Sequence, residues 1–178
     1  ARKVSGARMG IVGIGRIGQA IAQRALAFNM SVAYTARSAK ADLPFKYVAT
    51  PEALAAESDY LVVITPGGAA TRHMVNAQVL KALGPDGILV NVARGEIVDG
   101  AALEAALREG KLGGAALDVT EPEPLPAEAT LWSAPNLILT PHIAATGNKQ
   151  VGRRIAAVVQ ENLRRFIAGE TLHNIVEP

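Results

Sequence analysis

Met9-Gly10-Ile11-Val12-Gly13-Ile14-Gly15-Arg16-Ile17-Gly18 is the stretch that decides the fold. The apolar run 9–12 leads into three glycines with the spacing GxGxxG, and a helical pattern starts among them. In this context the motif predicts a strand–turn–helix unit that binds a dinucleotide. Gly13 permits the tight turn, Gly15 lets a pyrophosphate approach the backbone, and Gly18 lets the helix pack close to the strand. The free N–H groups at the helix start favour phosphate, and Arg16 can add a charge. The alternative is a glycine-rich turn without a ligand.

Short apolar runs alternate with helical patterns along the rest of the chain. Most of these runs lack polar alternation, as expected for strands that are covered on both faces. The predicted strands are 9–12, 32–34, 60–64, 88–92, 114–117 and 137–139. The alternation predicts an α/β fold: a Rossmann-type, doubly wound parallel sheet with helices on both faces. Residues 1–178 are expected to form one dinucleotide-binding domain.

Helix boundaries are marked by capping residues. Thr50 followed by Pro51 predicts a helix start. One later helix is bracketed by Asn76 and Gly84, and another by Asp99 and Gly110, with a Glu–Arg pair at 104 and 108. The first helix is expected to end near Asn29, and the last to run from about 148 to 168. On the first helix an apolar face is formed by Ile17, Ile21, Ala25 and Phe28, and a buried stripe on the last can be formed by Val151, Ile155, Val158, Phe166 and Ile167.

Composition excludes several classes of protein. The 18 basic and 16 acidic residues are nearly balanced, which argues against a nucleic-acid surface. The chain has no cysteine, which removes disulfides, thiolate metal sites and cysteine nucleophiles. No apolar run approaches the roughly 18 residues of a membrane span. We therefore expect a cytoplasmic protein with neither a nucleic acid nor a membrane as partner.

The end of the second strand bears on the choice of cofactor. A dinucleotide fold usually has an acidic residue here that binds the ribose hydroxyls, but this chain has Thr35. Arg37 and Ser38 follow, with Lys40 nearby. An acid would repel a 2′-phosphate, whereas an arginine beside a small neutral residue would hold it by charge-assisted hydrogen bonds. The sequence therefore predicts NADP(H) over NAD(H). The alternative is that Arg37 is an ordinary surface arginine.

A series of further segments follows the glycine motif in a specific order and spacing. They are Thr71-Arg72-His73-Met74-Val75-Asn76, Val90-Asn91-Val92-Ala93-Arg94-Gly95, Leu117-Asp118-Val119 with Glu123-Pro124, and Leu139-Thr140-Pro141-His142-Ile143. Together with residues 9–18 they resemble the D-isomer-specific 2-hydroxyacid dehydrogenases, particularly the glyoxylate/hydroxypyruvate reductases. The resemblance covers nearly the whole chain.

The resemblance implies three catalytic positions, Arg94, Glu123 and His142, each of which follows a predicted strand. Reduction of a 2-keto acid needs a hydride from the nicotinamide and a proton for the carbonyl oxygen. Histidine is a natural proton donor near neutral pH, and a neighbouring carboxylate orients its ring. An arginine can hold the substrate carboxylate and polarise the carbonyl. Glu121 is a competing acid, but the spacing favours Glu123. Without the other motifs, a turn histidine would be the simpler interpretation, and no third ligand suggests a metal site.

The resemblance also implies a set of cofactor contacts. Asp118 would contact the nicotinamide carboxamide, with a loop cap as the alternative, and the loop that begins at Thr65-Pro66 would pass along the adenosine side of the cofactor, with a plain Pro–Gly turn as its alternative. The expected cofactor-binding residues are Gly13, Gly15, Arg16, Ile17, Gly18, Ala36, Arg37, Ser38, Thr65, Pro66, Thr71, Val92, Ala93, Asp118 and His142.

Members of this family normally carry a substrate domain ahead of the coenzyme domain, and nothing in this chain corresponds to it. We therefore expect residues 1–178 to bind cofactor but to have little activity alone. The expected substrate is a small 2-keto or 2-hydroxy acid such as glyoxylate or hydroxypyruvate, and the family implies a homodimer. The alternative function is a dinucleotide-sensing corepressor, because corepressors of the C-terminal-binding-protein type share this fold and retain the three catalytic residues.

Overall fold

The computed structural model describes residues 3–145 and 149–175. The chain divides into two compact units, Ala1–His142 and Ile143–Pro178. The sequence predicts a single domain over 1–178, and the sheet that defines the predicted fold lies entirely in the first unit. The second unit holds one helix, α5 (Lys149–Ile167), and the tail that follows it.

The first unit is built on a seven-stranded sheet in the order β3-β2-β1-β4-β5-β6-β7. All neighbouring strands are parallel. The strands are β1 (Arg8–Val12), β2 (Ser31–Thr35), β3 (Lys46–Tyr47), β4 (Tyr60–Val63), β5 (Ile88–Asn91), β6 (Gly114–Leu117) and β7 (Leu137–Leu139). This confirms the predicted parallel α/β fold. Only β3 is absent from the prediction, since two residues are too few to show a pattern.

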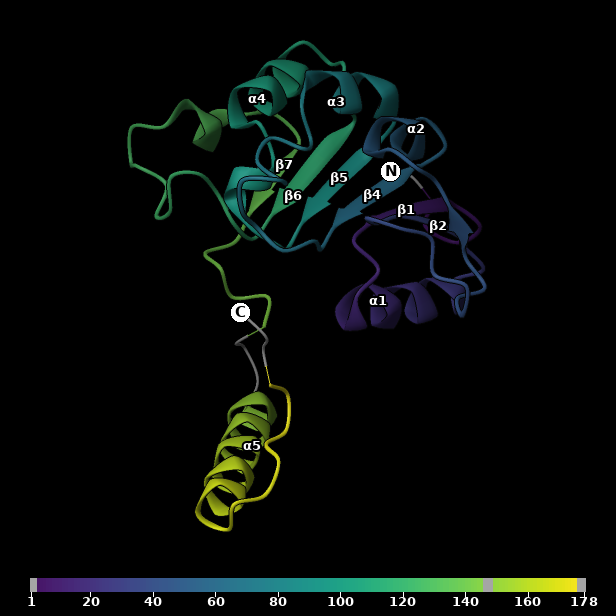
Figure 1. Ribbon diagram of the computed structural model, residues 1–178. Coiled ribbons are helices and arrows are strands. Elements are labelled where there is room, and N and C mark those ends of the chain that lie inside the picture. Colours follow the sequence, from purple (N-terminus) through teal and green to yellow (C-terminus); the bar gives the residue numbers. More distant parts are fainter. Residues whose placement is uncertain (1–2, 146–148, 176–178) are drawn as a thin grey trace. The chain divides into compact units, whose positions relative to one another are not determined.

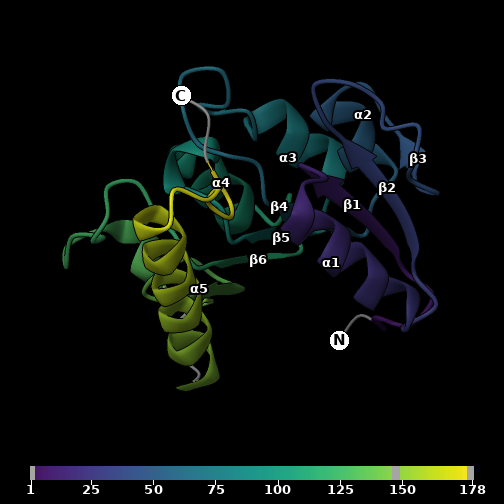
Figure 2. The same cartoon turned by 60° about the horizontal axis from the view of Figure 1, so that its bottom comes forward.

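Helices cover both faces of the sheet, as predicted. Helix α1 (Arg16–Leu26) lies on one side, and α2 (Pro51–Ala56), α3 (Ala77–Leu83) and α4 (Gly100–Arg108) lie on the other, as Figures 1 and 2 show. Successive strand residues point to opposite faces. Ile11 of β1 therefore packs in the core on the α1 side, whereas Val12 packs in the core on the α2–α4 side.

The predicted capping residues begin their helices as expected. Thr50 Oγ1 accepts a hydrogen bond from the N–H of Ala53 at 3.2 Å, and Pro51 is the first residue of α2. Asn76 caps α3 through the N–H groups of residues 78 and 79, and Asp99 caps α4 through that of Ala102. Because each cap follows a loop from the sheet, these side chains fix where each helix leaves the strands.

The apolar face predicted for the first helix is only partly buried. On α1 the buried residues are Gly18, Ala22 and Ala25, whereas Ile17 and Phe28 are 62% and 56% exposed. Helix α1 ends at Leu26, and Asn29 adopts a left-handed conformation (φ 56°) in the turn beyond it. Helix α1 approaches the sheet on its small residues with Ile21 partly buried beside them, whereas Ile17 lies off that face and Phe28 lies beyond the end of the helix.

Helix α5 exposes most of the apolar stripe that the sequence predicts to be buried. The exposed members include Ile155, Val158, Phe166 and Ile167. The predicted start at Asn148 lies outside the described residues, and the helix ends at Ile167. No helix in the described part of the chain is both long and apolar enough to span a membrane.

An ion network lies near the end of α5. Glu161 accepts hydrogen bonds from Arg164 and Arg165, and Arg164 also pairs with Glu170 at 2.8 Å. These hydrogen bonds, from Arg164 first, lower the pKa of the Glu161 carboxyl to about 2.

Candidate active site

The glycine turn after β1 is shaped by two close approaches. Gly13 has a left-handed backbone (φ 100°), and a Cβ atom there would lie 2.8 Å from the backbone nitrogen of Thr65. A Cβ atom on Gly18 would collide with the carbonyl oxygen of Gly13. Both positions therefore require glycine, for the reasons that the sequence predicts. At Gly15, by contrast, a Cβ atom would meet nothing within 4 Å.

This turn has the features of a phosphate site. Gly15 is the N-cap residue of α1, no side chain caps the helix, and its first turn holds no acidic residue. The N–H groups and the positive end of the dipole of α1 thus face the open space beside Gly15. A pyrophosphate fits such a cradle, because it needs N–H donors and close approach to the backbone.

A groove of about 660 Å³ continues from this turn across the carboxyl ends of β4 and β5. Its walls include the exposed side chain of Ile17. The predicted contact residues that line it are Ile17, Thr65, Pro66, Val92 and Ala93, together with Arg94. Thr71 does not line it, and the Thr71 hydroxyl donates to the carbonyl of Pro66 at 2.9 Å within its own loop.

Thr35 and Arg37, at and just after the end of β2, differ in their exposure. The Thr35 side chain is buried, and its hydroxyl donates to the carbonyl of Ala49 at 3.4 Å. Arg37 and Ser38 are exposed in the loop that follows, and Ala36 between them and the strand is half-buried. Thr35 therefore takes the place of an acid without presenting a charge, while the guanidinium at position 37 is accessible.

Arg94 follows β5 in a turn held at both ends. The side-chain amide of Asn91 accepts a hydrogen bond from the N–H of Ala93 at 3.0 Å and donates one to the carbonyl of Arg94 at 2.9 Å. On the outer side, a Cβ atom on Gly95 would collide with the backbone carbonyl of Thr120. The turn that carries Arg94 thus packs directly against the loop that follows β6.

His142 and Glu123 are brought together by the loops after β7 and β6. The imidazole Nδ1 atom lies 2.6 Å from Oε1 of Glu123, and both side chains are partly exposed. His142 has a left-handed backbone (φ 55°), and its backbone N–H donates to the backbone carbonyls of Asp118 and Thr140. A non-glycine residue in this region is uncommon and is often found at functional sites.

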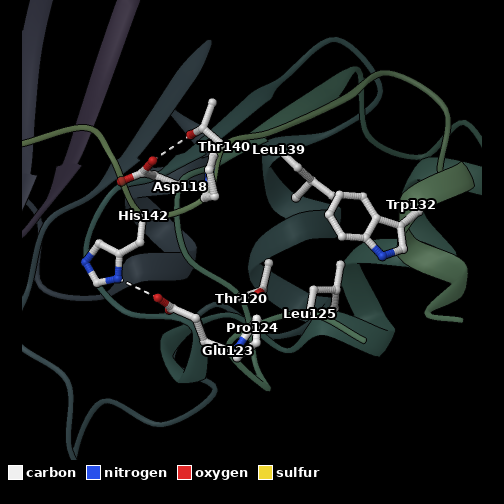
Figure 3. Close-up of a pocket in the computed structure, with 10 residues that line it drawn as sticks. Asp118, Thr120, Glu123, Pro124, Leu125, Trp132, Leu139, Thr140 and His142 are labelled. Carbon is white, nitrogen blue, oxygen red and sulfur yellow. Dashed lines mark hydrogen bonds and ion pairs between the residues drawn. The ribbon is translucent and has the colours of Figure 1, made fainter. Parts of the chain in front are cut away.

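Asp118 supports the same loop. Its buried carboxylate accepts a hydrogen bond from the Thr140 hydroxyl at 2.6 Å, so that β6 and β7 are joined just where His142 begins its turn. A pocket of about 460 Å³ lies beside these residues. Figure 3 shows Glu123 between the imidazole of His142 and the apolar side of the pocket, where Leu125 and Trp132 lie.

Glu121, the competing acid, is turned to another partner. Its carboxylate accepts a hydrogen bond from Arg72 at 2.6 Å and lies 3.5 Å from Nε2 of His73. The hydrogen bond from Arg72 is the main cause of the lowered pKa of Glu121. The N–H of His73 donates to the carbonyl of Glu96. These contacts join the loops that follow β4, β5 and β6, and they leave Glu123 as the acid beside His142.

Some site features escape the sequence pattern. Asn91, Gly95 and the Arg72–Glu121 ion pair all shape the site but lie outside the predicted catalytic and cofactor sets. An asparagine that ends a buried strand just before a turn is the one local signal that indicates its role. Among the residues that the structure describes, no group of three or more His, Asp or Glu side chains could hold a metal ion.

Comparison with known proteins identifies related reductases. The chain is 46% identical over 171 residues to glyoxylate/hydroxypyruvate reductase A of Arabidopsis thaliana, an alignment that covers 96% of this chain and 54% of the relative. The chain spans about half the length of the curated relatives it matches. The corepressor alternative gains no support from these relatives.

Solved structures of related enzymes share the fold. An NADPH-dependent glyoxylate/hydroxypyruvate reductase from Sinorhizobium meliloti superposes with a TM-score of 0.85 and 45% identity, covering 94% of this chain and 52% of that one. A D-lactate dehydrogenase with NAD⁺ from Lactobacillus jensenii superposes with a TM-score of 0.90 and 27% identity, covering 100% and 58%. The related structures therefore include one of an NADPH-dependent enzyme and one with NAD⁺.

The family model described as "D-isomer specific 2-hydroxyacid dehydrogenase, NAD binding domain" matches residues 1–144, which include the sheet, the glycine turn and His142. The chain therefore belongs to the D-isomer-specific 2-hydroxyacid dehydrogenases and contains their nucleotide-binding domain.

Proposed function

We propose that the protein containing this chain reduces a small 2-keto acid, glyoxylate or hydroxypyruvate, with NADPH. The observation that carries the proposal is the contact between His142 and Glu123 beside a turn that presents Arg94. All three residues follow neighbouring parallel strands, and ligands of such sheets bind at the carboxyl edge.

His142 is the proton donor in this proposal. Its Nδ1 atom faces Glu123, which leaves Nε2 to hold a proton for the substrate carbonyl oxygen. Glu123 fixes the orientation of the ring and balances the charge of the imidazolium. When bound, the cofactor supplies the hydride that goes to the carbonyl carbon, and the proton from His142 completes the hydroxyl group.

Arg94 is the substrate anchor. A guanidinium pairs with the carboxylate of a 2-keto acid and stabilises negative charge that develops on the carbonyl oxygen. Arg94 is exposed and lines the groove that we assign to the cofactor, so that it stands at the boundary between cofactor and substrate. In the reverse direction the same groups would bind the 2-hydroxy acid and take up its proton.

The cofactor lies along the groove from Gly15 to Ala93, with its pyrophosphate at the start of α1. NADP(H) is preferred over NAD(H), because Arg37 and Ser38 are exposed at the end of β2 and Thr35 brings no negative charge. Asp118 serves the nicotinamide end, since it lies under the loop that carries His142. The proposed cofactor contacts are the set that the family resemblance implies, although Thr71 lies outside the lining of the groove.

The proposal extends to the assembly of the whole protein. Residues 1–178 act as the nucleotide-binding part, a further substrate domain closes the active site, and the protein works as a homodimer in the cytoplasm. These features follow from the family resemblance. Light scattering on the native protein measures the oligomeric state.

The test is a substrate panel with the native protein. We expect oxidation of NADPH with glyoxylate and hydroxypyruvate, and slower oxidation of NADH with each. Absence of turnover with every small 2-keto acid, in a protein that binds NADPH, would remove the enzyme assignment and keep only the nucleotide site.

A further inference from the structure

Asn91 is a buried polar side chain in the middle of the sheet. It is the last residue of β5, and its register partners are Val63 of β4 and Leu117 of β6. It is 0% exposed. Burying a polar amide in such a place costs free energy unless both its donor and its acceptor are paired. The hydrogen bonds of Asn91 therefore indicate its role.

Both ends of the Asn91 amide are used by the turn that follows. Oδ1 accepts from the N–H of Ala93 at 3.0 Å, and Nδ2 donates to the carbonyl of Arg94 at 2.9 Å. The first bond forms the start of the turn and the second fixes its far end. Leucine would offer neither group, and aspartate would place an acceptor against the Arg94 carbonyl.

The position of this turn determines where the Arg94 guanidinium lies. Nη1 of Arg94 donates to the carbonyl of Ala93 at 2.7 Å, so the side chain is tied to the backbone that Asn91 holds. On its outer side the same turn is restricted by the close contact between Gly95 and the backbone carbonyl of Thr120. With that side blocked, a turn released by Asn91 would shift toward the groove lined by Val92 and Ala93.

We propose that Asn91 is a positioning residue that sets the direction from which Arg94 approaches the substrate carboxylate. The inference rests on the proposed role of Arg94 as the substrate anchor. Asn91 itself touches neither cofactor nor substrate, because it is completely buried beneath the turn.

The experiment compares Asn91→Asp and Asn91→Ser in the native protein, with glyoxylate as substrate and saturating NADPH. Aspartate keeps an acceptor for Ala93 and loses the donor, while serine is uncharged and too short to reach both partners. We expect each variant to raise KM by about tenfold or more. Should the aspartate variant not fold, the serine variant decides alone.

Ser58→Ala is the matched control, because Ser58 is also buried and donates to a backbone carbonyl, that of Leu54 at 2.6 Å, away from the turn. Its melting temperature should fall, as for the Asn91 variants, with KM unchanged. A rise in KM for this control as well would mean that general destabilisation explains the effect, and the inference would be lost.

The double variant Asn91→Ser/Arg94→Ala separates the two proposals. If Asn91 acts through Arg94, the double variant has the same KM as Arg94→Ala alone. Multiplicative effects, or an unchanged KM in the folded Asn91 variants, overturn the inference while leaving the anchor role intact. An unchanged KM in Arg94→Ala overturns the anchor role and this inference together.

Discussion

Nδ1 of His142 lies 2.6 Å from Oε1 of Glu123, although the two residues are 19 positions apart and come from the loops after different strands. Glu121, two residues earlier, pairs instead with Arg72. The difference between these two glutamates gives the first test of the site.

In the native protein, His142→Ala should lower kcat for glyoxylate reduction by about 100-fold or more, because the proton donor is lost. Glu123→Gln should lower it by about tenfold or more, since an amide cannot balance the charge of an imidazolium. Steady-state oxidation of NADPH measures both. Glu121→Gln is the control. A loss of kcat in that variant as large as in Glu123→Gln would contradict the assignment of Glu123 as the acid beside His142.

Nucleotide preference can be measured on residues 1–178 by calorimetric titration. We expect NADPH to bind at least about tenfold more tightly than NADH, a difference of about 1.4 kcal/mol. Arg37→Ala should remove most of that difference, while Arg24→Ala, which removes an equal charge from the end of α1, should not. Equal binding of the two nucleotides by the unaltered chain would contradict the NADP assignment and leave the family unaffected.

Two glycines of the same motif should respond in opposite ways to alanine. Gly18→Ala forces a Cβ atom against the Gly13 carbonyl, so we expect a loss of stability of about 1–3 kcal/mol. Gly15→Ala meets open space, so the melting temperature should hold while NADPH binding weakens. Thermal melts with and without NADPH distinguish the two, and full affinity in Gly15→Ala would mean that the pyrophosphate lies elsewhere.

The network on α5 predicts a pH dependence. The folded-state pKa of Glu161 is lowered from 4.5 to about 2, so its contribution to stability is fully present above 4.5 and is lost as the pH falls toward 2. Far-ultraviolet circular dichroism should therefore show helix loss in this range that is smaller in Glu161→Gln. The same substitution at Glu128, an exposed glutamate of the first unit, should leave the transition unchanged. Identical acid transitions in all three proteins would contradict the assignment.

Residues 1–178 by themselves should bind NADPH but turn over little glyoxylate. The chain spans about half the length of its curated relatives, and one wall of a cleft cannot exclude water from the reaction. Measuring NADPH binding and glyoxylate turnover on the same preparation of residues 1–178 checks this. Turnover by residues 1–178 equal to that of the native protein would show that all required groups lie in this chain.

Much of this architecture is readable in the sequence because its signals are local. The caps at Thr50, Asn76 and Asp99 and the glycine at 18 each act on backbone groups within a few residues. Periodicity fails where packing distance decides. Ile17 has the spacing of a buried residue, yet α1 packs on the sheet through Gly18, Ala22 and Ala25, and Ile17 lines the groove instead.

Contacts between loops are the part that the sequence could not provide. Arg72 and Glu121 are 49 positions apart, and only the strand order brings their loops together. Spacing favours Glu123 over Glu121 as the partner of His142, but the arrangement that separates their roles is visible only in three dimensions.

The close approach of Gly95 to the Thr120 carbonyl has a consequence for engineering selectivity. Position 95 tolerates no side chain, so a saturation library there should return glycine almost alone. Position 120 contributes backbone atoms to that contact, and the Thr120 hydroxyl donates to the carbonyl of Pro122 at 3.0 Å. Under the proposed function, a change of selectivity among 2-keto acids would therefore come from other side chains on the loop after β6, with the arginine turn unchanged.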